Sequence, residues 1–158
     1  MVKRKVKIEK NTVQETLVIP LYGKAWAVRN YPDIFKDTDC EALMAALDYD
    51  FSVLKKKEKS IAMKLGSLAT AMRQYALAQE VKEYLKDHPN ALIVNMGCGL
   101  DTTGHLADNG TCRFVNVDFP NVIEVREALI PKERRKKIVL RYGRSFSRCT
   151  ACVRCSKS

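Results

Sequence analysis

The most constraining feature of this sequence is a short apolar run that ends in a pair of glycines. Residues 91–96 read Ala-Leu-Ile-Val-Asn-Met, and such a nearly continuous apolar run is typical of a β-strand that is covered on both faces. Gly97 and Gly99 follow at once, and glycine lets the backbone turn sharply and lets a ligand approach it closely. We therefore expect a ligand-binding turn at the end of a strand in a parallel sheet.

The segment after the glycine pair repeats this pattern. Residues 102–109 predict a short helix, residues 112–118 a second strand and residues 121–129 a second helix. Strand, glycine turn, helix, strand and helix in this order predict a right-handed βαβ unit with its helices outside a parallel sheet. The remaining sequence can add at most a third strand, which would begin near residue 137.

The residues before this unit are expected to be largely helical. Residues 41–47 and 68–86 carry apolar side chains near a 3.6-residue period, and a break is expected at residues 66–67. Residues 15–23 contain a proline and predict a loop or a single turn, whereas residues 50–59 predict a polar connection. The expected fold class is α/β: an N-terminal helical segment followed by the first half of a Rossmann-like sheet, which is incomplete.

The spacing between Gly97 and Asp118 predicts a cofactor that contains adenosine. Asp118 ends the second strand 21 residues after Gly97, where one carboxylate can accept hydrogen bonds from both ribose hydroxyls. A dinucleotide site would have a third glycine at Thr102, but Asp101 and Thr102 stand here, and a carboxylate repels a diphosphate. S-adenosylmethionine (SAM) has no phosphate, and its ammonium group can donate to Asp101 or to a backbone carbonyl. The alternative is that the glycines only make a turn and Asp118 only caps the next helix.

Two motifs resemble the leucine carboxyl methyltransferase family: Gly97-Cys-Gly-Leu-Asp-Thr102 and Val115-Asn-Val-Asp-Phe-Pro120. That family comprises class I SAM-dependent methyltransferases, including bacterial O-methyltransferases associated with polyketide synthesis. Residues 15–25 resemble the start of the bacterial branch, and the resemblance covers about residues 12–139. It implies methyl transfer from SAM to an oxygen of a small-molecule or peptide acceptor, either a carboxylate or a hydroxyl.

The resemblance also implies roles for individual residues. Gly97 and Gly99 would line the methionine portion of SAM, Asp118 would bind the ribose hydroxyls, and Arg73 would pair with a carboxylate at the active site. With Asp101 these residues form the expected cofactor site, and no catalytic residue is predicted. Without the resemblance, Arg73 is interpreted as a surface side chain whose charged end reaches solvent.

The sequence departs from the family in its length. A class I methyltransferase sheet has seven strands, whereas two clear strands and the start of a third are found here. We therefore expect a polar tail over 1–11, the N-terminal part of a methyltransferase domain over 12–139, and an unpatterned tail over 140–158 that resembles a shifted reading frame or a truncated gene product. Such a fragment is expected to be inactive and to self-associate through its exposed sheet edge.

Other classes of function are less well supported. The net charge is +10, but residues 140–158 hold five basic and no acidic residues, and the basic clusters lack interleaved aromatic residues, so nucleic-acid binding is not expected. Cys149, Cys152 and Cys155 have the spacing of iron–sulfur ligands without the fourth cysteine, so no metal is expected. No secretion signal or membrane span is evident, which predicts a cytoplasmic protein. The alternatives are a non-catalytic fragment that binds nucleoside or a partner, and a basic, cysteine-tailed protein that binds metal or nucleic acid.

Overall fold

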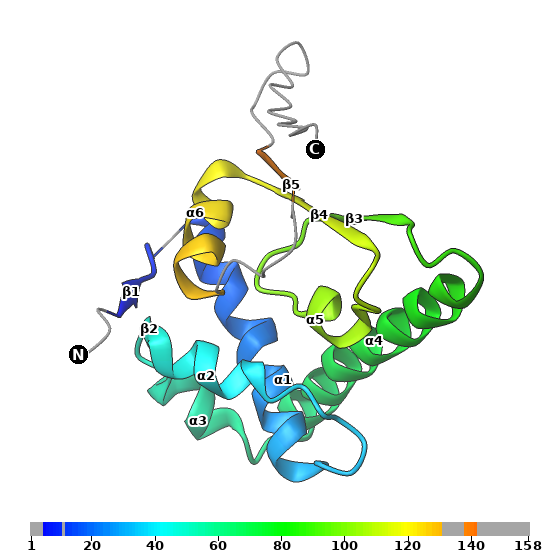
Figure 1. Ribbon diagram of the computed structural model, residues 1–158. Coiled ribbons are helices and arrows are strands. Elements are labelled where there is room, and N and C mark those ends of the chain that lie inside the picture. The colour runs from blue at the N-terminus through cyan, green and yellow to red at the C-terminus, as the bar shows by residue number, and fades with distance from the viewer. Residues whose placement is uncertain (1–4, 11, 131–137, 142–158) are drawn as a thin grey trace.

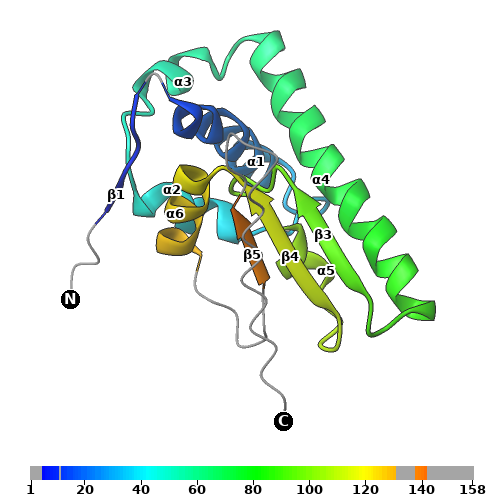
Figure 2. The ribbon, with the colours of Figure 1, turned by 90° about the horizontal axis from the view of Figure 1, so that it is seen from above.

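A parallel sheet forms the C-terminal part of the described chain. The computed structural model describes residues 5–10, 12–130 and 138–141, and all of the tail expected over 140–158 except its first two residues lies outside them. Within this part of the chain the sheet has the order β3-β4-β5, so each strand lies beside the next one in sequence (Figure 1, Figure 2). Its strands are β3 (Leu92–Met96), β4 (Arg113–Asp118) and β5 (Ile138–Arg141). This confirms the mixed α/β class, and β5 extends two residues past the expected boundary at residue 139.

The two helices that connect these strands lie on the same face of the sheet. α5 (Thr103–Ala107) joins β3 to β4, and α6 (Pro120–Leu129) follows β4 toward β5. From β3 to β4 and from β4 to β5 the chain moves in the same direction across the sheet. Because crossovers between parallel strands are right-handed, both connecting helices then lie on the same face of the sheet. In Figure 1 the strands accordingly lie above the helices.

The N-terminal segment is mostly helical, as expected, and it packs beside and beneath the sheet. Its core is shared by three helices, with Leu21 of α1, Leu43 of α2 and Val122 of α6 all buried in one cluster. Its elements in chain order are β1 (Val6–Lys7), the 3-10 helix η1 (Val13–Leu17), α1 (Val18–Asn30), α2 (Asp39–Ala46), β2 (Leu47–Asp48), α3 (Ser52–Lys57) and α4 (Ile61–Asp87).

The prediction of a loop over residues 15–23 was wrong. The chain forms η1 and then α1 without interruption, and Pro20 lies in the first turn of α1. A proline is tolerated there because the amides of the first helical turn have no carbonyl partner within the helix. The fully buried side chains of Val18, Leu21 and Tyr22 show that burial, rather than local propensity, determines this helix.

The break expected at residues 66–67 was also wrong. α4 begins at Ile61, seven residues before the expected start at residue 68, and the Ser60 side chain caps it by accepting a hydrogen bond of 3.2 Å from the Met63 amide. Gly66 lies within the helix, and a single helical glycine costs only about 1 kcal/mol relative to alanine. The packing of α4 against α1 and α5 outweighs this cost.

Two segments expected to be unstructured contain short elements. Val6 and Lys7 of the expected polar tail form β1, which pairs in parallel with β2, and Ile8 is buried in the main core cluster. The expected connection over 50–59 contains α3. In both cases, contacts with residues distant in sequence order a segment that has no clear pattern of its own.

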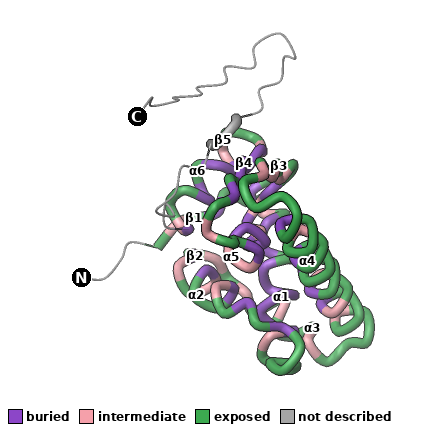
Figure 3. Tube along the Cα trace, turned by 45° about the vertical axis from the view of Figure 1, so that its right-hand side comes forward, coloured by how far each residue is buried: buried purple, intermediate pink, exposed green. Residues whose placement is uncertain are grey.

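The expectation that the first strand is covered on both faces was wrong for the described chain. Ile93 packs with Phe114 against α4 and α5, whereas Leu92, Val94 and Met96 on the opposite face are 47%, 50% and 72% exposed. Figure 3 shows the same contrast, with β4 mostly buried and β3 alternating between exposed and intermediate residues. β3 therefore has an uncovered face and, within the described residues, an unpaired edge.

None of the described helices is both long enough and apolar enough to cross a membrane. Among the same residues, no cluster of three or more histidine, cysteine or acidic side chains could hold a metal ion. The three cysteines considered as iron–sulfur ligands lie outside the described part of the chain.

Candidate cofactor site

A cavity of about 660 Å³ opens at the carboxyl end of β3. Open parallel sheets bind ligands at this end of their strands, and the volume is in the range of small-molecule sites. Its walls come from η1 and α1, from one side of α4, and from the turn after β3. The five residues expected to form a cofactor site all line this cavity: Arg73, Gly97, Gly99, Asp101 and Asp118.

Both glycines of the turn have backbone conformations that favour glycine. Gly97 has a φ of 64° and Gly99 a φ of 46°, which is the left-handed region. A side chain on Gly97 would point into open space, whereas a Cβ on Gly99 would lie 3.1 Å from Leu17. Gly97 is therefore the position at which a ligand can approach the backbone, and Gly99 is required by packing as well as by conformation.

Hydrogen bonds to the backbone amide and to the backbone carbonyl of Gly99 hold the glycine turn, which is the turn formed by residues 97–99 after β3. The Asp118 carboxylate accepts from the Gly99 amide at 2.8 Å, and its other oxygen accepts from the Phe119 amide at 2.8 Å. The buried Arg126 of α6 donates to the Gly99 carbonyl oxygen at 2.9 Å. These bonds fix the end of β3 relative to the end of β4 and orient the Asp118 carboxylate at the cavity wall.

Asp101 lines the cavity and also accepts hydrogen bonds from two neighbouring residues. One carboxylate oxygen accepts hydrogen bonds from the Thr103 amide at 2.9 Å and from the Asn95 side chain at 3.2 Å. Asp101 thus stabilises the start of α5, and the same carboxylate contributes negative charge to the cavity wall.

Two cations line the cavity near the carboxylates. Arg73 on α4 was predicted, whereas Lys24 on α1 was not. Lys24 is buried, and its ammonium donates to the Leu100 carbonyl oxygen at 3.4 Å. A buried ammonium needs a carboxylate or several carbonyl partners, and Lys24 and Arg73 are the two cationic side chains of the cavity lining that could bind an anionic group.

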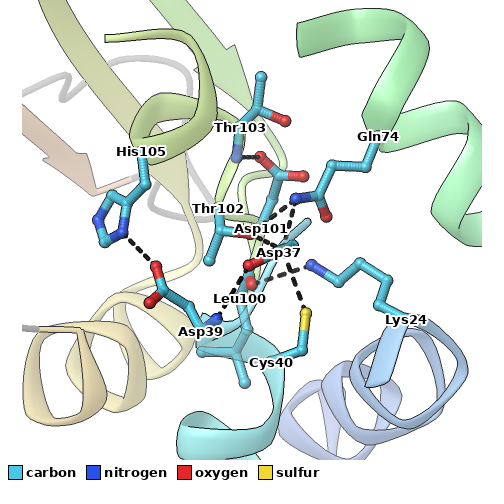
Figure 4. Close-up of polar contacts among 10 residues, drawn as sticks. All are labelled: Lys24, Asp37, Asp39, Cys40, Gln74, Leu100, Asp101, Thr102, Thr103 and His105. Carbon is cyan, nitrogen blue, oxygen red and sulfur yellow. Dashed lines mark hydrogen bonds and ion pairs between the residues drawn. The ribbon is translucent and has the colours of Figure 1, made fainter. Parts of the chain in front are cut away.

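A buried polar cluster joins α4 to the glycine turn (Figure 4). The Gln74 amide nitrogen donates to the Asp37 carboxylate at 2.8 Å and to the Thr102 hydroxyl at 2.7 Å, and Thr102 donates to the same carboxylate oxygen of Asp37. Burial raises the pKa of Asp37, but hydrogen bonds from Thr102, Cys40 and Gln74 and the charge of Lys24 outweigh it, so the pKa is lowered overall. Asp37 is thus a buried carboxylate that holds three separate segments together.

Two buried oxygen atoms at the cavity wall have no hydrogen-bond partner among the described residues. They are the side-chain oxygen of Gln74 and the hydroxyl of Thr103, and both residues are more than nine-tenths buried. An unpartnered buried acceptor is costly, and a ligand that donates hydrogen bonds would remove this cost. An ammonium group is such a donor.

The cysteine in the turn is not a nucleophile at neutral pH. Burial raises the pKa of the Cys98 thiol to about 11, so the thiol form dominates. Nδ1 of His105 lies 2.7 Å from the Asp39 carboxylate, and His105 does not line the cavity. The site therefore contains groups that bind and orient a ligand, and its described side chains do not include an activated nucleophile.

Sequence reasoning found the residues of the turn and missed those that support it. Lys24, Asp37 and Gln74 come from three separate helical or loop segments, and no spacing in the sequence relates them to Gly97. The sequence signal for these residues was a lysine and a glutamine on otherwise apolar helix faces. A buried polar side chain requires a hydrogen-bond partner, so such residues indicate a polar cluster or a binding site.

A glycine turn and an acid lie at the carboxyl ends of neighbouring parallel strands, an arrangement that is typical of α/β proteins with a nucleotide-type cofactor. The leucine carboxyl methyltransferase profile matches residues 18–143, and the chain belongs to that family. The resemblance found in the sequence is thereby confirmed.

Among proteins of known function, the chain is similar to the tetracenomycin polyketide synthesis O-methyltransferase TcmP of Streptomyces glaucescens, with 31% identity over 121 residues. The alignment covers 76% of this chain and 43% of that enzyme, so the chain spans less than half the length of this relative. No solved structure matches the chain significantly.

Proposed function

We propose that this chain binds SAM in the cavity at the end of β3 and provides the cofactor half of an O-methyltransferase. The observation that carries the proposal is that all five predicted residues line one cavity whose glycine turn leaves open space at Gly97. Membership of the leucine carboxyl methyltransferase family and the similarity to an O-methyltransferase support the same class of reaction. The proposed acceptor is an oxygen nucleophile, a carboxylate or a hydroxyl.

The cavity residues fit the chemical groups of SAM. Asp118 would accept hydrogen bonds from the ribose hydroxyls, and Lys24 and Arg73 would pair with the carboxylate of the methionine portion. The ammonium would donate to the unpartnered oxygen of Gln74 or to Asp101. Bound SAM supplies an electrophilic methyl group on a sulfonium, and the role of these residues is to orient it. A carboxylate acceptor is already anionic, so it needs no general base.

Asp118→Ala tests this assignment. The variant lacks two charge-assisted hydrogen bonds to the ribose, so its affinity for SAM or demethylated SAM should fall by about a hundredfold or more. Isothermal titration calorimetry measures the affinity, and Glu124→Gln on the exposed side of α6 is the matched control that removes an acidic charge outside the cavity. Because Asp118 also holds Gly99, circular dichroism of both variants should first show the wild-type helix content.

Two results would contradict the proposal. One is an affinity for SAM that is the same in Asp118→Ala and in the wild type. The other is a wild-type chain that binds NADH more tightly than SAM.

A further inference from the structure

The chain turns an exposed corner where α3 is followed by the first turns of α4. None of the side chains over residues 52–66, here called the α3–α4 corner, is buried. Figures 1 and 2 show this corner on the side of the molecule away from the sheet, and Figure 3 shows it as mostly exposed. The corner nevertheless contains the large apolar side chains of Val53, Ile61 and Leu65, which are 58%, 76% and 62% exposed.

The apolar surface continues along one face of α4. Ile61, Leu65 and Met72 are separated by four and seven residues, which places them on the same side of a helix with 3.6 residues per turn. The exposed Ala62 and Ala69 lie beside them and widen this face. The exposed fraction falls from 76% at Ile61 to 48% at Met72, so the apolar surface is most accessible at the corner itself. Exposed apolar surface with a polar rim is typical of an interaction site.

The rim of this apolar face is strongly basic. Residues 52–66 contain one acidic residue, Glu58, which already accepts hydrogen bonds from the Tyr22 hydroxyl and from the Arg29 guanidinium. Five basic residues minus one acidic residue give the corner a charge of +4. The basic residues are all exposed and are Lys55, Lys56, Lys57, Lys59 and Lys64.

Charge and shape indicate what this corner binds. A second copy of the chain would bring the same positive charge against it, which is unfavourable. An acidic helix of another protein would need a groove. However, Val53, Ile61 and Leu65 line neither the cavity at the end of β3 nor a second cavity, of about 490 Å³, between α1, α4 and residues 33–37. A lysine-rich amphipathic element that projects from the molecule suits a flat surface with anionic headgroups.

We propose that the α3–α4 corner binds the protein reversibly to an anionic lipid surface. Ile61 and Leu65 enter the boundary between headgroups and acyl chains, and the lysines of the corner pair with the anionic headgroups. Thr70 and Leu77, which line the cavity at the end of β3, lie on the opposite side of α4. The cavity therefore stays accessible when the corner is bound, and the inference does not depend on the ligand of that cavity.

The test is sedimentation of the full chain with vesicles of phosphatidylcholine mixed with phosphatidylserine, and with vesicles of phosphatidylcholine alone. The chain should bind the mixed vesicles, and added salt should release it because exposed charges are screened. Lys55→Gln with Lys57→Gln should lower the partition coefficient by about thirtyfold. Lys82→Gln with Lys86→Gln removes the same charge from exposed positions of α4 that begin about 27 Å beyond Lys64, and this control should bind like the wild type.

A second pair of variants tests the apolar contribution at constant charge. Ile61→Ser with Leu65→Ser should lower the partition coefficient by about tenfold or more, because the inserted side chains are lost. Ile19→Ser with Tyr84→Ser is the control, since these side chains are 59% and 53% exposed outside the corner, and it should bind like the wild type. All variants retain the five basic residues of 140–158, so the differences between variants measure the corner alone.

Three results would overturn the proposal. One is a wild-type chain that binds the mixed vesicles no better than phosphatidylcholine alone. Another is a corner variant that binds the mixed vesicles as tightly as its control. The third is a wild-type chain that leaves the vesicles free and binds a soluble amphipathic peptide of leucine and glutamate through Ile61 and Leu65, since the corner would then accept an acidic helix.

Discussion

At the scale of single residues, the polar side chains of this protein connect the cavity at the end of β3 to the core. Asp118 and Arg126 hold the glycine turn from β4 and α6, and Asp37 holds α4 to Thr102 on the other side. Each of these groups is buried or partly buried and is satisfied by a group from a distant segment. Removing one partner leaves the other unpaired, which costs more than the interaction itself contributes.

Asp37 should make the stability of the protein depend on acidic pH. Its pKa is lowered in the folded protein, so its contribution is fully present above the unfolded value near 3.8 and is lost as the pH falls through the folded value. Asp37→Asn should lower the free energy of unfolding at pH 7 by about 2 kcal/mol and should weaken the loss of stability in acid. Urea titrations followed by circular dichroism between pH 3 and 7 measure both effects.

The control for this prediction is Asp50→Asn. The pKa of Asp50 is also lowered, first by the hydrogen bond from the backbone of Ser52, but the carboxylate is exposed at the start of α3 and its partner is two residues away. Its replacement should leave the unfolding midpoint at pH 7 nearly unchanged. An equal effect of the two substitutions would contradict the role given to Asp37.

At the scale of elements, the long helix α4 carries much of the architecture. Its residues that line the cavity are Arg73, Gln74, Leu77 and Val81, and it also crosses α1. The two helices approach closely at Gly23, where an added Cβ would lie 3.2 Å from the Ser67 backbone. The small residues at this crossing let α1 bring Lys24 to the cavity wall.

Two glycine substitutions should therefore have opposite effects. Gly66 lies on the exposed side of α4 with no atom near an added Cβ, so Gly66→Ala should stabilise the protein by about 1 kcal/mol through helix propensity. Gly23→Ala adds the same methyl group at the crossing and should destabilise by about 1–3 kcal/mol, because the Ser67 backbone must move. Thermal unfolding of both variants tests the pair, and a stabilised Gly23→Ala variant would show that the crossing is looser than the structure indicates.

At the scale of the whole molecule, the described chain has a cavity at the carboxyl end of its parallel sheet, and one side of that sheet is open. The cavity is bounded by α1, α4 and the glycine turn, but β3 has an exposed apolar face and an unpaired edge among the described residues. Methyl transfer depends on holding the methyl group and the acceptor oxygen in line and on excluding water. A cavity open on this side is poorly suited to both.

We therefore predict that this chain alone shows no detectable methyl transfer from radiolabelled SAM to carboxylate or hydroxyl acceptors. The same preparation should bind demethylated SAM weakly in calorimetry. Weak binding without methyl transfer would show that the proposed cofactor site is formed although the reaction does not take place. A monomeric chain that turns over SAM by itself would show that the uncovered part of the relative is dispensable.

Several features could be predicted from the sequence because they depend on near neighbours. The apolar runs, the glycine pair and the acid 21 residues after Gly97 established the two strands, the turn between them and the Asp118 position. The positive φ angles at Gly97 and Gly99 are a property of single residues that favours glycine, so the two glycines in the sequence already indicate a turn there. The family resemblance rests on the same short motifs.

Other features were decided only by the tertiary structure. Pro20 and Gly66 suggested breaks, but α1 and α4 continue because each buries apolar side chains against the other. Lys24, Asp37 and Gln74 reach the cavity from separate segments, and their pairing is not encoded in any spacing. The apolar run at β3 correctly indicated a strand, yet an apolar residue is compatible with both a covered and an open face. Which face is covered depends on where the other elements pack, because burial is a property of the assembled chain and not of the strand itself.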